Sequence, residues 1–191
     1  MKYKIIYADP PWKYDDELNN NPKYGGITYP TMEINDICNL PIKDLSDEDC
    51  ILFMWTTMPK LEDAFKVINA WGFKYRTCGF VWVKINDNGK PRTGIGKYTN
   101  SNAELCLIAK KGKIRRINNC INQIIRAKIT KHSAKPLEIY KRIEDLMGDL
   151  PRIELFARHK REGWDAWGNQ VPKEEQKLLR IITLNSGSDK K

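Results

Sequence analysis

The sequence predicts an α/β domain with a mainly parallel sheet, because short apolar runs typical of buried strands alternate with amphipathic helical patterns. The chain has 191 residues, of which 41% are hydrophobic and 30% charged, and this length is sufficient for one full hydrophobic core. We see no internal repeat that would indicate a different architecture. We therefore expect one domain over residues 1–185 and a disordered polar tail over residues 186–191.

Five apolar runs are expected to form strands. They are residues 3–8, 50–55, 73–84 (with the strand ending at 80–83), 104–109 and 153–157. The first run leads into a polar loop that extends to about residue 32, and loops of that length are commonly functional or disordered.

Two segments are expected to form helices. The first has Pro59 in its first turn and Gly72 just past its end, with an apolar face of Leu61, Ala64, Phe65 and Ile68. The second opens at Pro136 and ends at Gly148, with an apolar stripe of Leu137, Ile139, Tyr140, Ile143 and Met147. In such a fold, ligands bind at the carboxyl ends of strands, which makes Asp9 and Arg158 candidate site residues.

The most informative stretch is Asp9-Pro10-Pro11-Trp12, which directly follows the first strand. An adenine amino group has two N–H donors, and its lone pair localises only when both donors find acceptors. Asp9 offers a carboxylate, and the carbonyl of Pro10 is held rigidly by its ring. Trp12 offers a face on which an extruded or single-stranded base could stack. The simpler alternative is an ordinary proline turn with Trp12 at the edge of the core.

The net charge of +9 is concentrated in one segment. Residues 110–135 contain nine basic side chains and no acidic one, so the remainder of the chain is balanced. Such a concentration favours a nucleic-acid backbone as partner, although a solvated basic face is the simpler explanation.

Composition argues against several other classes of protein. No apolar run approaches the roughly 20 residues of a membrane span, and the N-terminus enters a strand without a secretory leader, so we expect a cytoplasmic protein. The five cysteines form no C-x-x-C pair and there are only two histidines, so neither a metal site nor a disulfide framework is expected.

Several stretches in order resemble the Asp-Pro-Pro-Trp type of adenine-N6 methyltransferase, over roughly residues 3–171. This family includes the catalytic subunit of the eukaryotic messenger-RNA adenine methyltransferase and many bacterial and phage enzymes. The matching stretches are residues 8–12, 29–32, 53–55, 71–73, 81–84, 102–107, 132–136, 154–158 and 167–170.

The resemblance implies a Rossmann-like, S-adenosylmethionine-dependent methyltransferase fold whose motif order is circularly permuted, with the catalytic strand first. The catalytic set would be Asp9, Pro10, Pro11 and Trp12, and the cofactor would be held by Asp9, Lys135, Phe156, Arg158, Asn169 and Gln170. A histidine of the eukaryotic enzyme has no counterpart in register, since Lys160 takes its place and His159 lies one residue earlier.

The candidate substrate contacts combine aromatic and basic side chains. They are Trp12, Tyr29, Tyr98, Lys110, Lys111, Lys113, Arg115 and Arg116, with Tyr24 as a further aromatic candidate. Glu104 matches a family position near the active-site loop, although an acidic residue at a strand start is commonly structural. The alternative for the aromatic residues is that they cover the core.

The expected reaction is methyl transfer to the N6 amine of adenine in nucleic acid. DNA is favoured over RNA, because a compact enzyme resembles the bacterial and phage members. A catalytically silent, nucleic-acid-binding partner subunit is the main alternative, and methylation of cytosine N4 or of a protein amide is another. A homodimer or a partner subunit is left open.

Overall fold

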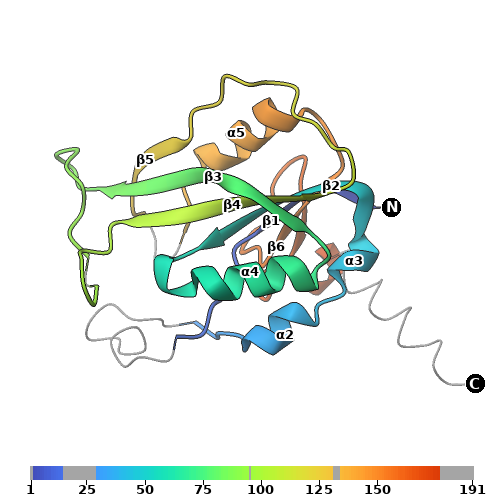
Figure 1. Ribbon diagram of the computed structural model, residues 1–191, viewed down its shortest axis with the longest axis horizontal. Helices are drawn as coiled ribbons and strands as arrows, with labels where there is room; N and C mark the ends of the chain where they lie inside the picture. Colours follow the sequence, from blue (N-terminus) through green and yellow to red (C-terminus); the bar gives the residue numbers. More distant parts are fainter. Residues whose placement is uncertain (1, 15–28, 95, 131–133, 177–191) are drawn as a thin grey trace, which may run out of the picture.

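A seven-stranded sheet organises the protein (Figure 1). The computed structural model describes residues 2–14, 29–94, 96–130 and 134–176. The strands lie in the order β5-β3-β4-β2-β1-β6-β7. Their bounds are β1 Tyr3–Ala8, β2 Ser46–Thr56, β3 Lys74–Ile85, β4 Ala103–Lys111, β5 Ile124–Lys128, β6 Arg152–Leu155 and β7 Asp165–Trp167.

Most neighbouring strands run parallel. The pairs β1–β2, β1–β6, β3–β5 and β6–β7 are parallel, whereas β4 is antiparallel to both β2 and β3. The described residues between β3 and β4 form no helix that would carry the chain back across the sheet, so the returning strand is antiparallel. The predicted α/β fold with a mainly parallel sheet is confirmed.

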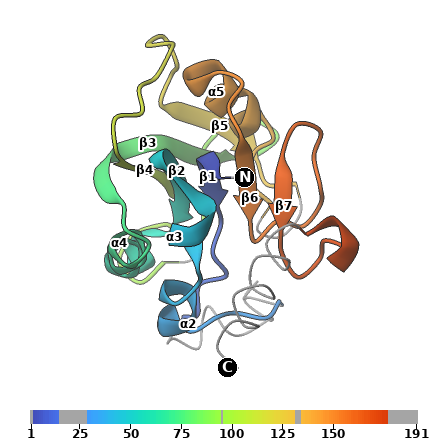
Figure 2. The ribbon, with the colours of Figure 1, turned by 90° about the vertical axis from the view of Figure 1, so that its right-hand side faces the viewer.

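Helices cover both faces of the sheet (Figure 2). Helix α5, Glu138–Met147, packs on the face that carries Tyr7, Phe53 and Trp55. The opposite face carries the alternate side chains of the same strands and is covered by three helices: α2 Ile34–Cys38, α3 Ile42–Leu45 and α4 Leu61–Ala70. Two short 3-10 helices, η2 Met58–Lys60 and η3 Lys173–Glu175, complete the described elements. Both faces of β1 and β2 are therefore buried, as their near-continuous apolar sequences predict.

The five expected strands and two expected helices are present, with changed bounds. Helix α5 begins at Glu138, two residues after Pro136, and Leu137 is 67% exposed, so its predicted place on the apolar stripe was wrong. The last predicted strand extends only to Leu155, because Phe156 has a φ of 62° and turns the chain out of the sheet. Strands β5 and β7 and helices α2 and α3 were not predicted.

Some predictions lie outside the described residues. They concern Tyr24, His132 and the tail over residues 186–191, and the single-domain prediction over residues 1–185 includes some of these segments. In the part of the chain that the structure describes, no helix has the length and apolar character needed to cross a membrane.

Gly168, directly after β7, lies against the backbone of Ala157. A Cβ atom at this position would overlap the Ala157 carbonyl oxygen, which has no room to move because Ala157 also pairs with Trp167. The buried side chain of Gln176 further fixes Gly168, since its amide donates to the Gly168 carbonyl at 2.8 Å. This close approach connects the end of β7 to the turn after β6.

We expect Gly168→Ala to lower the free energy of unfolding by roughly 2 kcal/mol or more, because backbone atoms must separate to admit the methyl group. Urea denaturation checks this. Gly89→Ala is the matched control, since nothing lies within 4 Å of a Cβ there and only its φ of 74° disfavours alanine, by about 1–2 kcal/mol. Equal losses in the two variants would contradict the packing argument.

Candidate active site

Asp9 lies at the carboxyl edge of the sheet between two neighbouring strands. Ala8, the last residue of β1, is in register with Met54 of β2 and with Leu155 of β6. Asp9 therefore directly follows the central strand β1. After β1 the chain continues to β2 on one side of it, and β6, much later in the sequence, pairs with β1 on the other side. Such a switch point leaves a crevice at the strand ends, where α/β proteins bind ligands.

The two prolines form a rigid turn. The N–H of Trp12 donates to the Pro10 carbonyl at 2.9 Å and closes a three-residue turn around Pro11. The Pro11 carbonyl accepts the N–H of Met32, also at 2.9 Å, which fixes the far end of the loop. A carbonyl oxygen has two lone pairs, so the Pro10 oxygen keeps one acceptor position.

Trp12 does not have the open face that base stacking requires. Its side chain is 4% exposed and packs in the core beside α4, and its indole N–H donates to the Trp55 carbonyl at 3.2 Å. The structure thus places Trp12 as an anchor that joins the proline turn to the end of β2, which corrects the expected stacking role. An indole buries more apolar area than any other side chain, and here that area stabilises the turn.

A chain of buried charges surrounds Asp9. The ammonium of Lys135 donates to Oδ2 of Asp9 at 2.7 Å and lies 3.3 Å from Oε2 of Glu104. The other oxygen of Glu104 pairs with Lys84 at 2.6 Å. Lys135 also lies 5.8 Å from the ring centroid of Trp55, so an aromatic face adds to its electrostatic stabilisation. This cluster connects β1, β3, β4 and the segment before α5.

The charges in this cluster shift one another's pKa values. Burial raises the pKa of Asp9, and the opposing attraction of Lys135 only partly offsets this. Burial acts in the same direction on Glu104, but Lys135 and Lys84 outweigh it, so the pKa of Glu104 is lowered and it stays ionised. Burial disfavours the charged form of Lys135, yet Asp9 and Glu104 dominate and raise its pKa. Lys135 is therefore a permanent cation.

A cleft of about 750 Å³ opens beside Asp9. Its walls come from the ends of β1, β5 and β6 and from the start of α5. Asp9, Lys135, Phe156 and Arg158, four residues predicted to hold the cofactor, line this one cleft. The volume falls in the range of roughly 300–1,000 Å³ that is typical of small-molecule sites.

Phe156 and Arg158 form the wall that β6 contributes. The left-handed φ of 62° at Phe156 is rare for a non-glycine residue and is commonly found at functional sites. Its ring packs edge-on against Trp167 with centroids 5.4 Å apart. The guanidinium of Arg158 lies 5.6 Å from the ring centroid of Tyr29, so Tyr29, a predicted substrate contact, lies beside a residue that lines the cleft.

The two other predicted cofactor residues lie differently. Asn169 and Gln170 follow β7, are exposed and do not line the cleft, although Gly168 holds them next to the turn that carries Arg158. His159 lines the cleft, whereas Lys160, which has the matching spacing, does not.

Glu154 is a cleft residue that sequence reasoning did not single out. Tyr140 donates to its carboxylate at 2.9 Å, and Arg161 stacks on the Tyr140 ring with 4.1 Å between Cζ and the centroid. Burial raises the pKa of Glu154 to about 7, while the hydrogen bond from Tyr140 opposes the shift. An acidic residue between two buried strand residues, Ile153 and Leu155, was the signal that could have identified it.

The predicted basic substrate contacts lie away from Asp9. Lys110 and Lys111, at the end of β4, pair with Ile51 and Cys50 of β2 and lie towards the end of the sheet opposite Asp9. Lys113, Arg115 and Arg116 follow them in the chain. Lys111 is held by the Ser46 hydroxyl at 2.6 Å, and the backbone N–H of Lys113 donates to Asp49. The antiparallel course of β4 therefore carries these residues away from Asp9, and their role as contacts to the nucleic acid stays a prediction.

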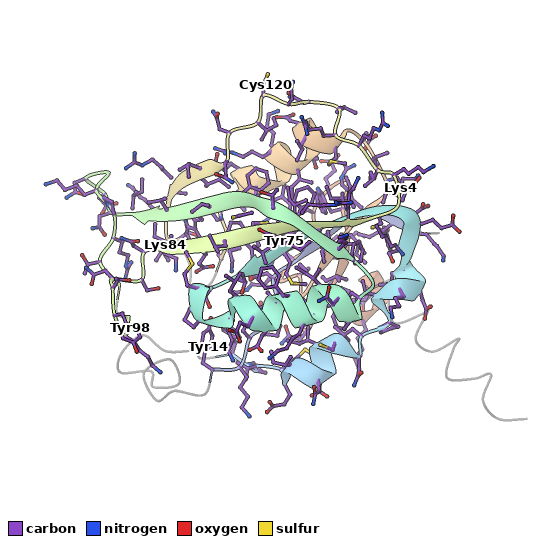
Figure 3. The ribbon with its side chains drawn as sticks, viewed as in Figure 1. Lys4, Tyr14, Tyr75, Lys84, Tyr98 and Cys120 are labelled. Carbon is purple, nitrogen blue, oxygen red and sulfur yellow. The ribbon has the colours of Figure 1, made fainter. Side chains whose placement is uncertain are left out.

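Tyr98 lies at the end of the sheet where Asp9 is found. It is 99% exposed in the connection between β3 and β4, at the same end of the molecule as Lys84 and Tyr14 (Figure 3). Lys4, near the start of β1, marks the opposite end. In the described ranges, no group of three or more histidine, cysteine or acidic side chains could hold a metal.

Replacing Lys135 with methionine is expected to lower the free energy of unfolding by roughly 3–5 kcal/mol at pH 8, because Asp9 would stay buried without its cation while Glu104 would keep only Lys84. The pKa of Asp9, which burial already raises, would then lie further above its unfolded-state value, so stability should recover as the pH falls towards 5. Guanidinium denaturation at the two pH values checks this. The double variant Lys135→Met/Glu104→Gln should regain part of the loss, and a pH-independent loss would contradict the electrostatic explanation.

Comparison with known proteins agrees with this arrangement. The MT-A70 family model matches residues 3–170. The chain is 35% identical over 190 residues to the Type II methyltransferase M.MunI of Mycoplasma sp, covering 90% of this chain and 78% of that protein. It is 34% identical over 175 residues to human METTL3, an N(6)-adenosine-methyltransferase catalytic subunit, covering 89% of this chain and 28% of that much longer protein. The chain thus belongs to the MT-A70 family of adenine-N6 methyltransferases.

Proposed function

We propose that this protein transfers a methyl group from S-adenosylmethionine to the N6 amine of adenine in nucleic acid, with DNA as the favoured polymer. The observation that carries this proposal is a pair of acceptors at the carboxyl end of β1. No described residue donates to Oδ1 of Asp9, and the Pro10 carbonyl keeps one lone pair. Two fixed acceptors suit the two N–H donors of an adenine amine.

The cleft residues fit the proposed cofactor. An ammonium group has three N–H donors, and Lys135 directs two of them to Asp9 and Glu104, so one remains for a methionine carboxylate. Asp9 could also face the methionine ammonium. Glu154 and Arg158 supply polar groups for ribose hydroxyls, and Phe156 supplies an apolar surface. Asn169 and Gln170 would have to turn towards the cleft to contribute.

The bound cofactor would supply a strongly electrophilic sulfonium methyl, so the protein mainly orients the amine. Asp9 and Pro10 would accept its N–H bonds and localise the nitrogen lone pair towards the methyl. The nitrogen becomes acidic as the new bond forms, and Asp9, whose pKa is raised by burial, is placed to take the released proton. Lys135 would keep the Asp9 carboxylate oriented throughout.

The pattern of alignment supports DNA as the favoured polymer. The chain aligns with most of the length of M.MunI, a Type II methyltransferase, but with only about a quarter of the length of METTL3. RNA is the second candidate, because METTL3 and other relatives are named for adenosine, the ribonucleoside.

Asp9→Asn is expected to lower turnover by at least about 100-fold while cofactor binding changes little, because the amide keeps the shape but loses the charge and one acceptor. Single-turnover methylation measures the first effect and calorimetry with S-adenosylmethionine the second. A folded Asp9→Asn protein with full activity would refute the role of Asp9.

The polymer is identified by supplying methyl-labelled S-adenosylmethionine with separate DNA and RNA pools. Enzymatic digestion and mass spectrometry then locate the label, and N6-methyldeoxyadenosine is the expected product. Label confined to N6-methyladenosine would select RNA. The absence of both labelled nucleosides, together with binding of nucleic acid but not of the cofactor, would select a catalytically silent partner subunit.

A further inference from the structure

A second groove, of about 800 Å³, lies at the edge of the sheet opposite Asp9. Its walls are the start of β3, the end of β4, the 114–123 segment and the last turn of α5. Ile51 on its floor pairs with Ile5 of β1, and Asp9 lies four residues further along that strand. At about 3.3 Å per residue, the groove begins roughly 13 Å from Asp9.

The groove is strongly cationic. Its charged lining residues are Arg76, Lys110, Arg115 and Arg116, and no acidic side chain is among the residues that line it. Within the described part of the chain, no carboxylate forms an ion pair with Arg76, Arg115 or Arg116, and all three are exposed. Unneutralised cations around a concave surface focus a positive potential and favour a polyanionic partner.

The segment that carries the two central arginines is fixed to α5. The N–H of Ile117 donates to the Leu146 carbonyl at 2.9 Å, and Arg142 donates to the Asn122 and Ile124 carbonyls at 2.5 and 3.0 Å. The Leu146 carbonyl in the last turn of α5 thus accepts from backbone N–H groups and not from the groove arginines. Ile117 itself is 74% exposed at the rim and adds apolar surface.

Edge strand β5 connects this groove to the catalytic cleft. The strand runs parallel to β3, from the 114–123 segment towards the catalytic end, and Ile85 pairs with Lys128 at its far end. Alternate residues of a strand share a side, so Arg126 and Lys128, both exposed, lie in one row. Lys128 already lines the cleft. Its exposed ion pair with Asp87 is weak and can exchange for a phosphate.

We propose that this groove is a second nucleic-acid contact, which holds the phosphate backbone of the strand that flanks the target adenine. The inference rests on the proposed function, since it assumes that the polymer occupying the catalytic cleft is nucleic acid. Arg126 and Lys128 guide the backbone from the cleft to the groove, and Arg115 and Arg116 bind it there. Because duplex DNA rises about 3.4 Å per base pair, the 13 Å separation corresponds to roughly four base pairs of flanking sequence.

The test compares Arg115→Glu/Arg116→Glu with the parent protein on two substrates that contain the same target. One has about two base pairs on each side of the adenine and the other about twelve. We expect the KM for the long substrate to rise about tenfold or more while kcat is unchanged, and the KM for the short substrate to stay constant. The salt dependence of long-substrate binding should also lose a slope of roughly two.

The charge-matched control is Lys43→Glu/Lys66→Glu, which changes the same number of charges on the face covered by α3 and α4. An equal rise in KM in both double variants would refute the proposal that the groove binds the phosphate backbone. An equal rise on both substrates would also refute it. A change from dimer to monomer in light scattering, without loss of nucleic-acid binding, would assign the groove to a second copy of the chain and also overturn it.

Direct binding separates this proposal from the proposed function. Fluorescence anisotropy with labelled long and short DNA and RNA measures binding of the nucleic acid to the groove, even if no methyl group is transferred. Absence of methylation with length-dependent, Arg115- and Arg116-dependent binding would refute the reaction and support the groove. Methylation with binding that is insensitive to both length and the double variant would refute the groove alone.

Discussion

The ion pair between Lys135 and Asp9 is the interaction on which the arrangement of the site depends. It joins residues that are 126 positions apart, and it holds the segment before α5 against the end of β1. Glu104 reinforces it from β4, and Lys84 reinforces Glu104 from β3. Burying charges is costly, and such a cluster is retained only if each charge meets a well-placed partner. Here every charged group has an oppositely charged partner, so the cluster holds β1, β3, β4 and the segment before α5 together.

The sheet order explains why these partners meet. Strand β1 is central and leaves the sheet beside the ends of β2 and β6, whereas β4 enters the sheet at this same edge because it runs antiparallel. Glu104, near the start of β4, is therefore close to Asp9, and Lys110, near its end, is remote. A single reversed strand thus separates Glu104, which contacts Lys135, from the basic residues that follow it in the sequence.

Sequence patterns predicted the parts of this fold that local periodicity encodes. The continuous apolar runs of β1 and β2 and the apolar stripes of α4 and α5 were sufficient, and Gly72 and Gly148 marked the helix ends correctly, each with a positive φ. Strand β7 has only three residues, and it is defined by its pairing with β6. Three residues are too few to show a strand periodicity in the sequence, so β7 was not predicted. Leu137 has the spacing of the apolar stripe, but it lies just before the first turn of α5. Its side chain therefore lines the cleft and does not pack in the core.

Site residues could be predicted from the sequence only where they directly follow a predicted strand. Asp9 and Arg158 could be placed at such ends from the sequence, and both line the cleft. Lys135 entered through the resemblance, because no spacing rule connects it to Asp9. Trp12 was misjudged because its orientation depends on the Trp55 carbonyl of another strand. The position of the basic segment relative to Asp9 could not be predicted, because a run of charge does not show where it lies in the fold. Strands β4 and β5 carry its two halves to opposite ends of the sheet.

The charge balance of the cluster has a consequence for the proposed reaction. Two carboxylates and two ammonium groups leave it formally neutral. The zwitterionic methionine end of a bound cofactor adds no net charge, so it could join the cluster without a further buried imbalance. The sulfonium of a bound cofactor would add one positive charge, which the reaction would remove as the proton lost from the methylated amine. A carboxylate whose pKa is raised by burial accepts such a proton more readily than an exposed one. Asp9 is therefore suited both to accept a hydrogen bond from the amine and to take up its proton in the proposed reaction.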